Sequence, residues 1–265
     1  MNKSTTDARD VSIDSLQSGA YAFPYHYIPS ATLHPRFARN WGFAPSYIAA
    51  LKLADSWLSA LLSGRDGEEH RHMDYGCGDG GFVYALIRSG KFGHVRFEGI
   101  DIDERAIQWA DLFGKDMPNV RYQCADLNNL QAETYDSGSL VEVFEHIPPI
   151  EADGFARAVA HSLKVGALLF VTVPSTEKPV GKKHYRHFDF ETLQAGFAAH
   201  FDVVECVGFE RSSWLGKLLK TAMMRSRFYV ETALTSDFMI GELAAKHKQL
   251  LGCGRICLIL RKRGG

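Results

Sequence analysis

The sequence is 265 residues long, 46% of them hydrophobic and 23% charged, and its formal net charge is −1. This composition is typical of a soluble globular enzyme, and a chain of this length can bury one core of substantial size. No apolar run approaches the ~20 residues that span a bilayer, so we expect no membrane-spanning helix.

The N-terminal part of the chain differs in character from the rest. Residues 1–20, polar over most of their length, are expected to form a flexible tail. Residues 21–62 begin with an aromatic and proline-rich stretch over 21–29 and continue with an amphipathic helix from about Pro45 to Leu62. We expect this segment to be a cap, either as a lid over a pocket or as packing at a sheet edge. Residues 63–265 are expected to form the main domain.

The main domain alternates short apolar runs with segments of helical periodicity. Seven runs are predicted as strands, over 70–75, 95–101, 120–124, 140–144, 167–173, 203–207 and 256–260. Helices are predicted over 81–89, 104–113, 152–163 and 190–201. This alternation predicts an α/β fold, a mainly parallel seven-stranded sheet with helices on both faces. Ligands of such sheets bind at the carboxyl ends of the strands.

A long segment over about 211–251 separates the last two predicted strands. Because loops of this length are rare in compact domains, we expect it to be an insertion with helices of its own. Together with residues 21–62, it is a second candidate for a lid over the pocket.

A glycine-rich loop follows the first predicted strand and opens the first crossover helix. It comprises Asp74, Tyr75, Gly76, Cys77, Gly78, Asp79 and Gly80. Its glycines permit a tight turn and a close approach of the backbone to a ligand. The spacing is GxGxG rather than the GxGxxG of dinucleotide enzymes, and the Asp79 carboxylate disfavours a pyrophosphate. The loop therefore suits a ligand with an ammonium group or hydroxyls.

Acidic residues also end the next two predicted strands. Asp101 lies 21 residues beyond Gly80, at a place where a carboxylate can accept hydrogen bonds from both hydroxyls of a ribose. Asp126 follows the third strand, where it can meet the amino group of an adenine. Both carboxylates fall at the ligand-binding edge of the predicted sheet.

From about Trp41 to Arg261 the chain resembles class I S-adenosylmethionine-dependent methyltransferases. Four segments occur in the order and spacing of that family: the DYGCGDG loop, GIDID, CADL and EVFEH. The resemblance implies a Rossmann-like fold and S-adenosyl-L-methionine as the cofactor. It also implies that the glycine-rich loop holds the methionine part. The other implied cofactor contacts are Asp101 and Ile102 at the ribose, Asp126 and Leu127 at the adenine, and Val141 and Glu142 at the methionine end.

Carboxylates and imidazoles gather after the fourth and fifth predicted strands. Because both strands end at the same edge of the sheet, four side chains are expected to converge: Glu142, Glu145, His146 and His187. Such a set suits a divalent cation, Mg²⁺ or Mn²⁺. A bound cation would orient two neighbouring acceptor hydroxyls and lower the pKa of the one that is methylated.

The ExxEH segment and a later HxF resemble two metal-dependent subgroups of the family. These are the small-RNA 3′-terminal ribose 2′-O-methyltransferases and the ubiquinone-biosynthesis O-methyltransferases. The resemblance implies the same four metal ligands, with His184 competing for the place of His187. Without a metal, His146 or His187 would act as the general base, with Glu142 beside the transferable methyl group. A purely structural role is also open, in which Glu145 and His146 only anchor the following helix.

The predicted reaction is O-methylation of a sugar, a polyol or a catechol-like small molecule. The acceptor is expected to be phosphorylated or glycan-derived, because Lys182, Lys183 and Arg186 can bind a phosphate and because this segment and residues 21–29 resemble methyltransferases of cell-surface glycan pathways. An RNA-terminal ribose is a less favoured acceptor, since the chain shows no separate RNA-binding module. The sequence also leaves open N-methylation and a non-catalytic regulatory role, and it does not determine the oligomeric state.

The cysteines indicate the compartment. There are five of them, an odd number without a CxxC pair, which argues against a disulfide framework or a zinc knuckle. With no apolar leader at the N-terminus, a reducing cytoplasm is expected. From Thr176 onward 15 Lys and Arg residues face 9 Asp and Glu residues, an excess that suits an anionic substrate but is too small for a dedicated nucleic-acid binder.

Overall fold

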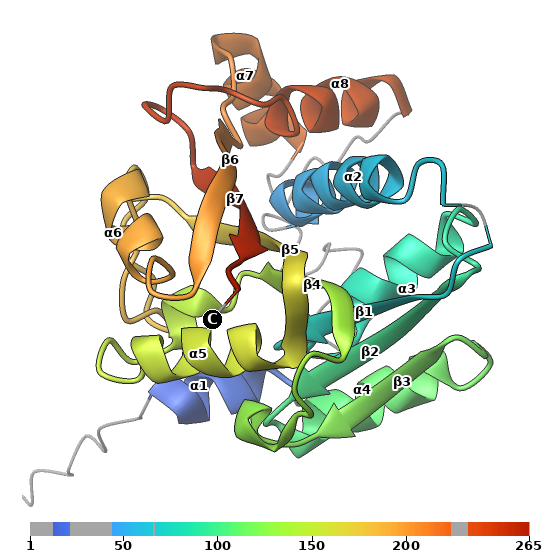
Figure 1. Ribbon diagram of the computed structural model, residues 1–265. Helices are drawn as coiled ribbons and strands as arrows, with labels where there is room; N and C mark the ends of the chain where they lie inside the picture. The colour runs from blue at the N-terminus through green and yellow to red at the C-terminus, as the bar shows by residue number, and fades with distance from the viewer. Residues whose placement is uncertain (1–12, 22–43, 66, 224–232, 265) are drawn as a thin grey trace, which may run out of the picture.

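The computed structural model describes residues 13–21, 44–65, 67–223 and 233–264. A seven-stranded sheet runs through the centre, with strand order β3-β2-β1-β4-β5-β7-β6 (Figure 1). Its strands are β1 (His70–Tyr75), β2 (Val95–Asp101), β3 (Val120–Cys124), β4 (Tyr135–Val141), β5 (Leu163–Pro174), β6 (Phe201–Phe209) and β7 (Arg255–Lys262). The strands from β3 to β5 pair in parallel, and β7 lies antiparallel between β5 and β6. The predicted fold class is confirmed.

Helices cover both faces of this sheet (Figure 1). They are α2 (Ala44–Leu61), α3 (Gly81–Arg88), α4 (Glu104–Gly114), α5 (Ala152–Ser162) and α6 (Phe190–Ala195), with two short 3₁₀ turns, η1 (Leu127–Asn129) and η2 (Phe144–His146). One apolar cluster joins α5 and α6 to the sheet through residues such as Val159 and Leu193. The other joins α2 and α3 to the opposite face through Leu58 and Val83.

Two predicted elements differ most from the structure in their bounds. The fourth strand, predicted over 140–144, is β4 over Tyr135–Val141. Its serines, Ser137 and Ser139, are fully buried, because they bond to polar side chains of β1 instead of to water. The strand ends where Glu142 takes a left-handed conformation, with φ of 58°. The helix predicted over 190–201 ends at Ala195, and Gly196 follows it.

Part of the segment expected to be a flexible tail is helical. The helix α1 (Ile13–Ala20) lies near α4, where Arg105 donates a hydrogen bond to the Ser18 carbonyl oxygen at 2.6 Å. Trp109 Nε1 donates to the Tyr21 carbonyl oxygen at 3.1 Å, and the Tyr21 side chain is buried. These contacts tie the segment to the main domain. The aromatic stretch after Tyr21 falls outside the described residues.

The predicted insertion contains two helices, α7 (Trp214–Met223) and α8 (Ala233–Leu243). Met239 and Leu243 of α8 are buried in the apolar cluster that also contains α2, so the insertion and α2 cover the same side of the sheet. Among the described residues, no helix combines the length and the apolar character that a membrane crossing requires.

Candidate active site

The glycine-rich loop connects β1 to α3 at the carboxyl edge of the sheet. Gly76, Gly78 and Gly80 have φ angles of 71°, 55° and 76°, a region that side chains rarely adopt. A Cβ atom on Gly76 would lie 2.6 Å from a methyl group of Val143, and one on Gly78 would lie 2.6 Å from the Tyr21 hydroxyl. The loop therefore requires glycine for its conformation and for its close neighbours.

The carboxylates near the loop hold its shape. Asp101 Oδ2 accepts a hydrogen bond from the Gly78 N–H at 2.9 Å, and its Oδ1 accepts from the Asp103 N–H at 2.9 Å. Burial raises the pKa of Asp101. Asp79 is fully buried, and its Oδ1 accepts from the N–H of Gly81 at the start of α3. Asp79 thus organises the turn from inside.

Two side chains of the predicted cofactor loop point into the protein interior. The Tyr75 ring is fully buried, and its hydroxyl lies 2.7 Å from Ser162 Oγ. The Cys77 thiol is also buried, which raises its pKa. The backbone N–H groups of Gly76 and Cys77 both donate to the Ile100 carbonyl oxygen. These positions shape the loop through packing and backbone bonds.

Asp74 is the last acidic residue before the glycines, and its side chain is only 2% exposed. Its Oδ1 accepts a hydrogen bond from Ser139 Oγ at 2.6 Å. Burial raises the pKa of Asp74 to about 7, although the bond from Ser139 acts in the opposite direction. The Asp74 carboxyl group at the start of the glycine-rich loop is therefore close to its pKa at neutral pH.

The predicted adenine end carries exposed apolar surface. Ile102, directly after β2, is 81% exposed, and Leu127 is half-buried. Asp126 is exposed and caps η1, where its Oδ1 accepts from the Asn128 N–H at 2.8 Å. This arrangement is compatible with a flat ring lying over Ile102 and Leu127, and the assignment stays a prediction.

Glu142 follows Val141 at the end of β4, and both of its carboxylate oxygens are occupied. Its Oε2 accepts from Arg255 Nε at 2.8 Å, and its Oε1 accepts from Thr172 Oγ1 at 3.0 Å. Arg255, at the start of β7, is buried and also pairs with Glu210. Burial opposes the charge of Arg255, but its two carboxylate partners raise its pKa.

This buried ion group extends toward α2. Glu210 Oε2 accepts from Lys178 Nζ at 2.5 Å, and its Oε1 accepts from Ser46 Oγ of α2 at 2.6 Å. Against the effect of burial, the charges of Arg255 and Lys178 hold the pKa of Glu210 below its ordinary value. The sequence analysis did not identify Arg255 as a site residue. The feature that could have indicated it is a single cation at the start of the apolar run RICLIL.

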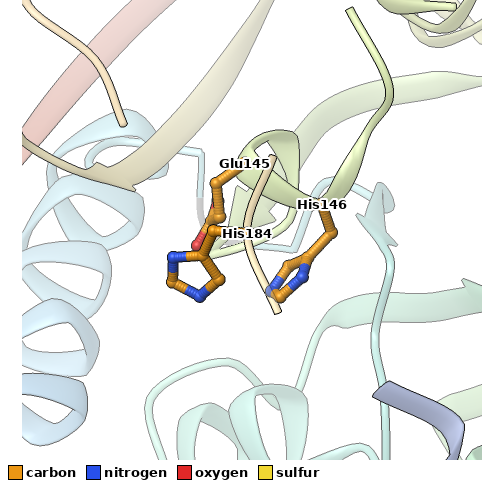
Figure 2. Close-up of side chains that lie close together, drawn as sticks. All are labelled: Glu145, His146 and His184. Atoms are coloured by element: carbon orange, nitrogen blue, oxygen red, sulfur yellow. The ribbon is translucent and has the colours of Figure 1, made fainter. Parts of the chain in front are cut away.

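Glu145, His146 and His184 form the one group of metal-ligating side chains found among the described residues (Figure 2). One potential ligand atom from each lies within 4.8 Å of the other two. Glu145 is fully buried, and neither carboxylate oxygen has a hydrogen-bond partner in the described part of the chain. Burial, with Glu142 nearby, raises the pKa of Glu145 well above its ordinary value.

Hydrogen bonds orient the imidazoles of this group. His146 Nδ1 lies 2.8 Å from the Lys183 carbonyl oxygen, so Nδ1 carries the proton and Nε2 carries the lone pair. His187 Nδ1 donates in the same way to the Lys178 carbonyl oxygen at 3.0 Å. With its Nδ1 proton on the Lys178 carbonyl oxygen, His187 can accept at Nε2 from His184 Nδ1 at 2.8 Å, which leaves the lone pair of His184 on Nε2.

Burial determines the charge of both facing imidazoles. It lowers the pKa of His146, and together with the neighbouring His146 and His187 rings it lowers the pKa of His184 to about 3. Both rings are therefore neutral at pH 7, with their Nε2 atoms available to accept a proton or bind a cation.

Of the four predicted metal ligands, the structure brings two into one group. Glu145 and His146 belong to the observed group, whereas Glu142 and His187 do not. Glu142 is held by Arg255 and Thr172, and His187 supports His184 from behind. His184 takes the place that the sequence analysis assigned to His187. The spacing of two histidines in one loop could not distinguish the inner ring from the supporting one.

The basic run expected to bind a phosphate divides into two environments. The Arg186 guanidinium lies over the rings of Phe144 and Phe188, at 5.3 and 5.0 Å from their centres. Lys182 is exposed to solvent. Arg186 is therefore a packing residue in this structure, and Lys182 is the more accessible cation.

Comparisons with known proteins agree with this architecture. The family described as a methyltransferase domain matches residues 47–222. A SAM dependent methyltransferase from Archaeoglobus fulgidus superposes with a TM-score of 0.54 at 18% identity, over 85% of this chain and 100% of that one. The N-methyltransferase NodS from Bradyrhizobium japonicum WM9 superposes with a TM-score of 0.51 at 16% identity, over 81% and 97%. At these identities the likeness shows the fold alone.

A curated relative is similar over a shorter region. The carboxy-S-adenosyl-L-methionine synthase of Helicobacter pylori (strain HPAG1) is 25% identical over 127 residues, which are 48% of this chain and 53% of that protein. The chain therefore matches about half the length of this relative. The family match, in contrast, covers well over half of the chain and includes the glycine-rich loop. The chain thus belongs to the methyltransferase-domain family, and it shares the fold of a SAM dependent methyltransferase.

Proposed function

We propose that the protein methylates a hydroxyl oxygen of a small molecule, a sugar, a polyol or a catechol-like ring. The observation that carries this proposal is the buried Glu145 carboxylate, unpartnered among the described residues and facing two neutral imidazoles. An unpaired buried carboxylate is costly, so its retention beside two lone-pair donors supports a chemical role. Family membership supports S-adenosylmethionine as the methyl donor, and the identity of the acceptor is part of the proposal.

A divalent cation fits the Glu145, His146 and His184 side chains. The carboxylate oxygens lack partners among the described residues, and both imidazoles present Nε2 while their Nδ1 atoms are held by other groups. Metal-binding histidines are commonly oriented in this way. Two nitrogen donors beside one carboxylate suit Mn²⁺ better than Mg²⁺, which prefers oxygen ligands. When bound, such a cation would lower the pKa of a hydroxyl that coordinates it.

The protein's own residues supply position and proton transfer. The ion pair with Arg255 and the hydrogen bond from Thr172 fix Glu142 at the end of β4. In the sheet, β4 lies next to β1, which leads into the glycine-rich loop. His146 Nε2 can accept the hydroxyl proton directly if no cation participates. In both routes the acceptor oxygen must lie in line with the methyl group, so alignment is the main contribution.

The proposed cofactor contacts follow the loop and the strand ends. The backbone from Asp74 to Asp79 would hold the methionine part, and Asp101 would hold the ribose. The exposed Ile102 and the half-buried Leu127 support an adenine site between them, with Asp126 at its edge. Val141 and Glu142 would border the methionine end.

Labelled methyl transfer tests the proposal. The full chain is incubated with methyl-labelled S-adenosylmethionine and a panel containing a catechol, a sugar phosphate, a nucleotide sugar, an oligoribonucleotide with a free 3′ ribose, and matched amines. Each reaction is run in Mn²⁺ and in excess EDTA, with Glu145→Gln and with Glu151→Gln, an exposed control. With Mn²⁺, we expect the wild type and Glu151→Gln to transfer label to a hydroxyl oxygen. We expect this transfer to be lost when EDTA is added, and to be lost in Glu145→Gln even with Mn²⁺.

Different results would contradict specific parts of the proposal. Label on amines only would show N-methylation. Full activity in EDTA would show that the reaction needs no cation, and would leave His146 as the proton acceptor. Preference for the oligoribonucleotide, with binding that weakens as salt rises, would identify an RNA acceptor. Tight cofactor binding without transfer to any acceptor would favour a non-catalytic, regulatory protein.

A further inference from the structure

A row of polar side chains crosses the centre of the sheet between β1 and β4. It consists of His70, His72 and Asp74 from β1 and Ser137 and Ser139 from β4, and the most exposed of them, His70, is 4% exposed. The strands are parallel, with His72 opposite Ser137 and Asp74 opposite Ser139. Since alternate residues of a strand share one face, all five lie on the same side of the sheet.

Four short contacts connect these side chains. His70 Nε2 lies 2.7 Å from Ser137 Oγ, and His72 Nδ1 lies 2.7 Å from the same oxygen. His72 Nε2 lies 2.9 Å from Ser139 Oγ, which in turn lies 2.6 Å from Asp74 Oδ1. The row therefore ends on a carboxylate in the cofactor loop, about 13 Å along the strand from its other end.

When Asp74 is ionised, the chemistry of the groups sets the direction of every bond. An ionised Asp74 can only accept, so Ser139 donates its single proton to it. Burial lowers the pKa of His72 to about 3, so its ring is neutral and its one proton lies on Nε2, donated to Ser139. Ser137 then donates to His72 Nδ1 and accepts from His70. All four hydrogen bonds thus point toward Asp74.

A network of this kind contributes little to stability compared with an apolar strand pair. Buried polar groups must all be satisfied merely to offset the loss of water, and apolar residues of similar volume often do as well or better. The two apolar clusters of this protein already hold the sheet. The network ends on Asp74, which lies shortly before Gly76 in the glycine-rich loop. This position indicates that the network serves the cofactor site.

We infer that Ser139 and His72 are positioning residues of the cofactor site, which hold the Asp74 carboxylate oriented and ionised for the ammonium group of S-adenosylmethionine. The inference rests on the proposed assignment of Asp74 to the methionine part of the cofactor. It is independent of the acceptor and of any cation. It extends the cofactor site to buried residues of β1 and β4 that lie outside the glycine-rich loop.

The charged neighbours of the row lie at its two ends. Asp101 and the Cys77 thiol lie near Asp74. Burial, and to a smaller extent the carboxylate of Asp101, favour the protonated form of Asp74. Only the bond from Ser139 is found to favour the ionised form. At the other end, His70 lies near Asp136, Arg65, His94 and Lys164. Between the ends, the rings of Trp57 and Phe97 lie against His72 and carry no charge.

Removal of the Ser139 hydroxyl tests the inference. The affinity of full-length Ser139→Ala is measured by calorimetry between pH 6 and 9 for S-adenosylmethionine and for 5′-methylthioadenosine, which lacks the amino-acid part. We expect S-adenosylmethionine to bind about tenfold more weakly at pH 7, and the midpoint of its pH profile to rise by about one unit. Affinity for 5′-methylthioadenosine should stay unchanged. The cofactor's own amine titrates identically against every variant.

Matched variants separate positioning from general damage. Ser162→Ala removes another buried serine hydroxyl, which bonds to Tyr75 on the opposite face of β1. It should change neither the affinity for either ligand nor the midpoint of the pH profile. Ser139→Thr keeps the hydroxyl and should restore the pH profile. His72→Leu, which leaves Ser139 without its donor, should produce a smaller shift in the same direction and serves if Ser139→Ala does not fold.

Three results would overturn the inference while leaving the assignment of Asp74 in place. Equal loss of both ligands in Ser139→Ala and His72→Leu would show a structural role only, and an unshifted pH midpoint would exclude control of Asp74. A loss of S-adenosylmethionine binding in Asp74→Asn without any loss in Ser139→Ala would also reject positioning. Unchanged binding in Asp74→Asn has a different meaning, because it would refute the assignment of Asp74 itself and with it the inference.

Discussion

Replacement of Glu145 by Gln should stabilise the metal-free protein while it removes cation binding. Both carboxylate oxygens of Glu145 are buried without a described partner. Leaving a buried polar group unsatisfied costs about 1–3 kcal/mol. Gln keeps the shape, carries no charge, and its amide can donate to a lone pair on His146 or His184 Nε2. We therefore expect Glu145→Gln to unfold with a free energy about 1–3 kcal/mol higher in EDTA.

Thermal unfolding with and without Mn²⁺ measures both effects. For a chain of this size each kcal/mol corresponds to roughly 2–4 °C, so the variant should melt about 2–12 °C higher in EDTA. Mn²⁺ at a hundred times its Kd adds about 2.7 kcal/mol to a protein that binds it, which raises the wild-type Tm by about 5–11 °C. The variant should not respond. Mn²⁺ should thus narrow or reverse the difference, as expected where a functional site is kept at a cost in stability.

Glu151→Gln is the matched control, because Glu151 is exposed and lies outside the candidate site. It should melt like the wild type in both conditions. The reasoning is refuted if Glu145→Gln is less stable than the wild type in EDTA, since the carboxylate would then have a partner that it needs. An equal Mn²⁺ response in both proteins would place the cation elsewhere.

Three further perturbations follow from the same contacts. Arg255→Leu removes the cation that pairs with the buried Glu142 carboxylate and one of the two cations that pair with Glu210, so urea denaturation should show a loss of about 3–5 kcal/mol in the free energy of unfolding. A loss below about 1 kcal/mol would contradict the role of this ion group. Asp101→Ala removes the acceptor of the Gly78 N–H and a proposed ribose contact, and should weaken S-adenosylmethionine binding by about tenfold or more in calorimetry; unchanged affinity would reject the assignment. Because the pKa of Asp74 is raised from 3.8 to about 7, its protonated form stabilises the fold below pH ~4, and this contribution is lost as pH rises through 7. Asp74→Asn should remove that loss, which is at most about 4 kcal/mol, and parallel pH profiles of unfolding free energy for the two proteins would disprove it.

Local patterns in the sequence were sufficient for most of the sheet. The runs over 70–75, 95–101 and 120–124 have the same bounds as β1, β2 and β3. The glycine-rich loop was equally readable, since its turns need positive φ. The fourth strand was predicted too far along the chain, because the serines of β4 are polar and indicate a surface position. They lie in the interior only because they form hydrogen bonds with the histidines of β1.

The sequence by itself determined the fold class and the conformation of the glycine-rich loop. These depend on the conformations of neighbouring residues, and residue type biases those conformations directly. The inner and supporting roles of His184 and His187, the capture of Glu142 by Arg255, and the direction of the bonds that end on Asp74 were decided only by the tertiary structure. Each depends on which donor faces which acceptor in the folded chain, as where Arg255 meets Glu142 from 113 residues away. Burial then sets the protonation states, and burial is a property of the packed molecule.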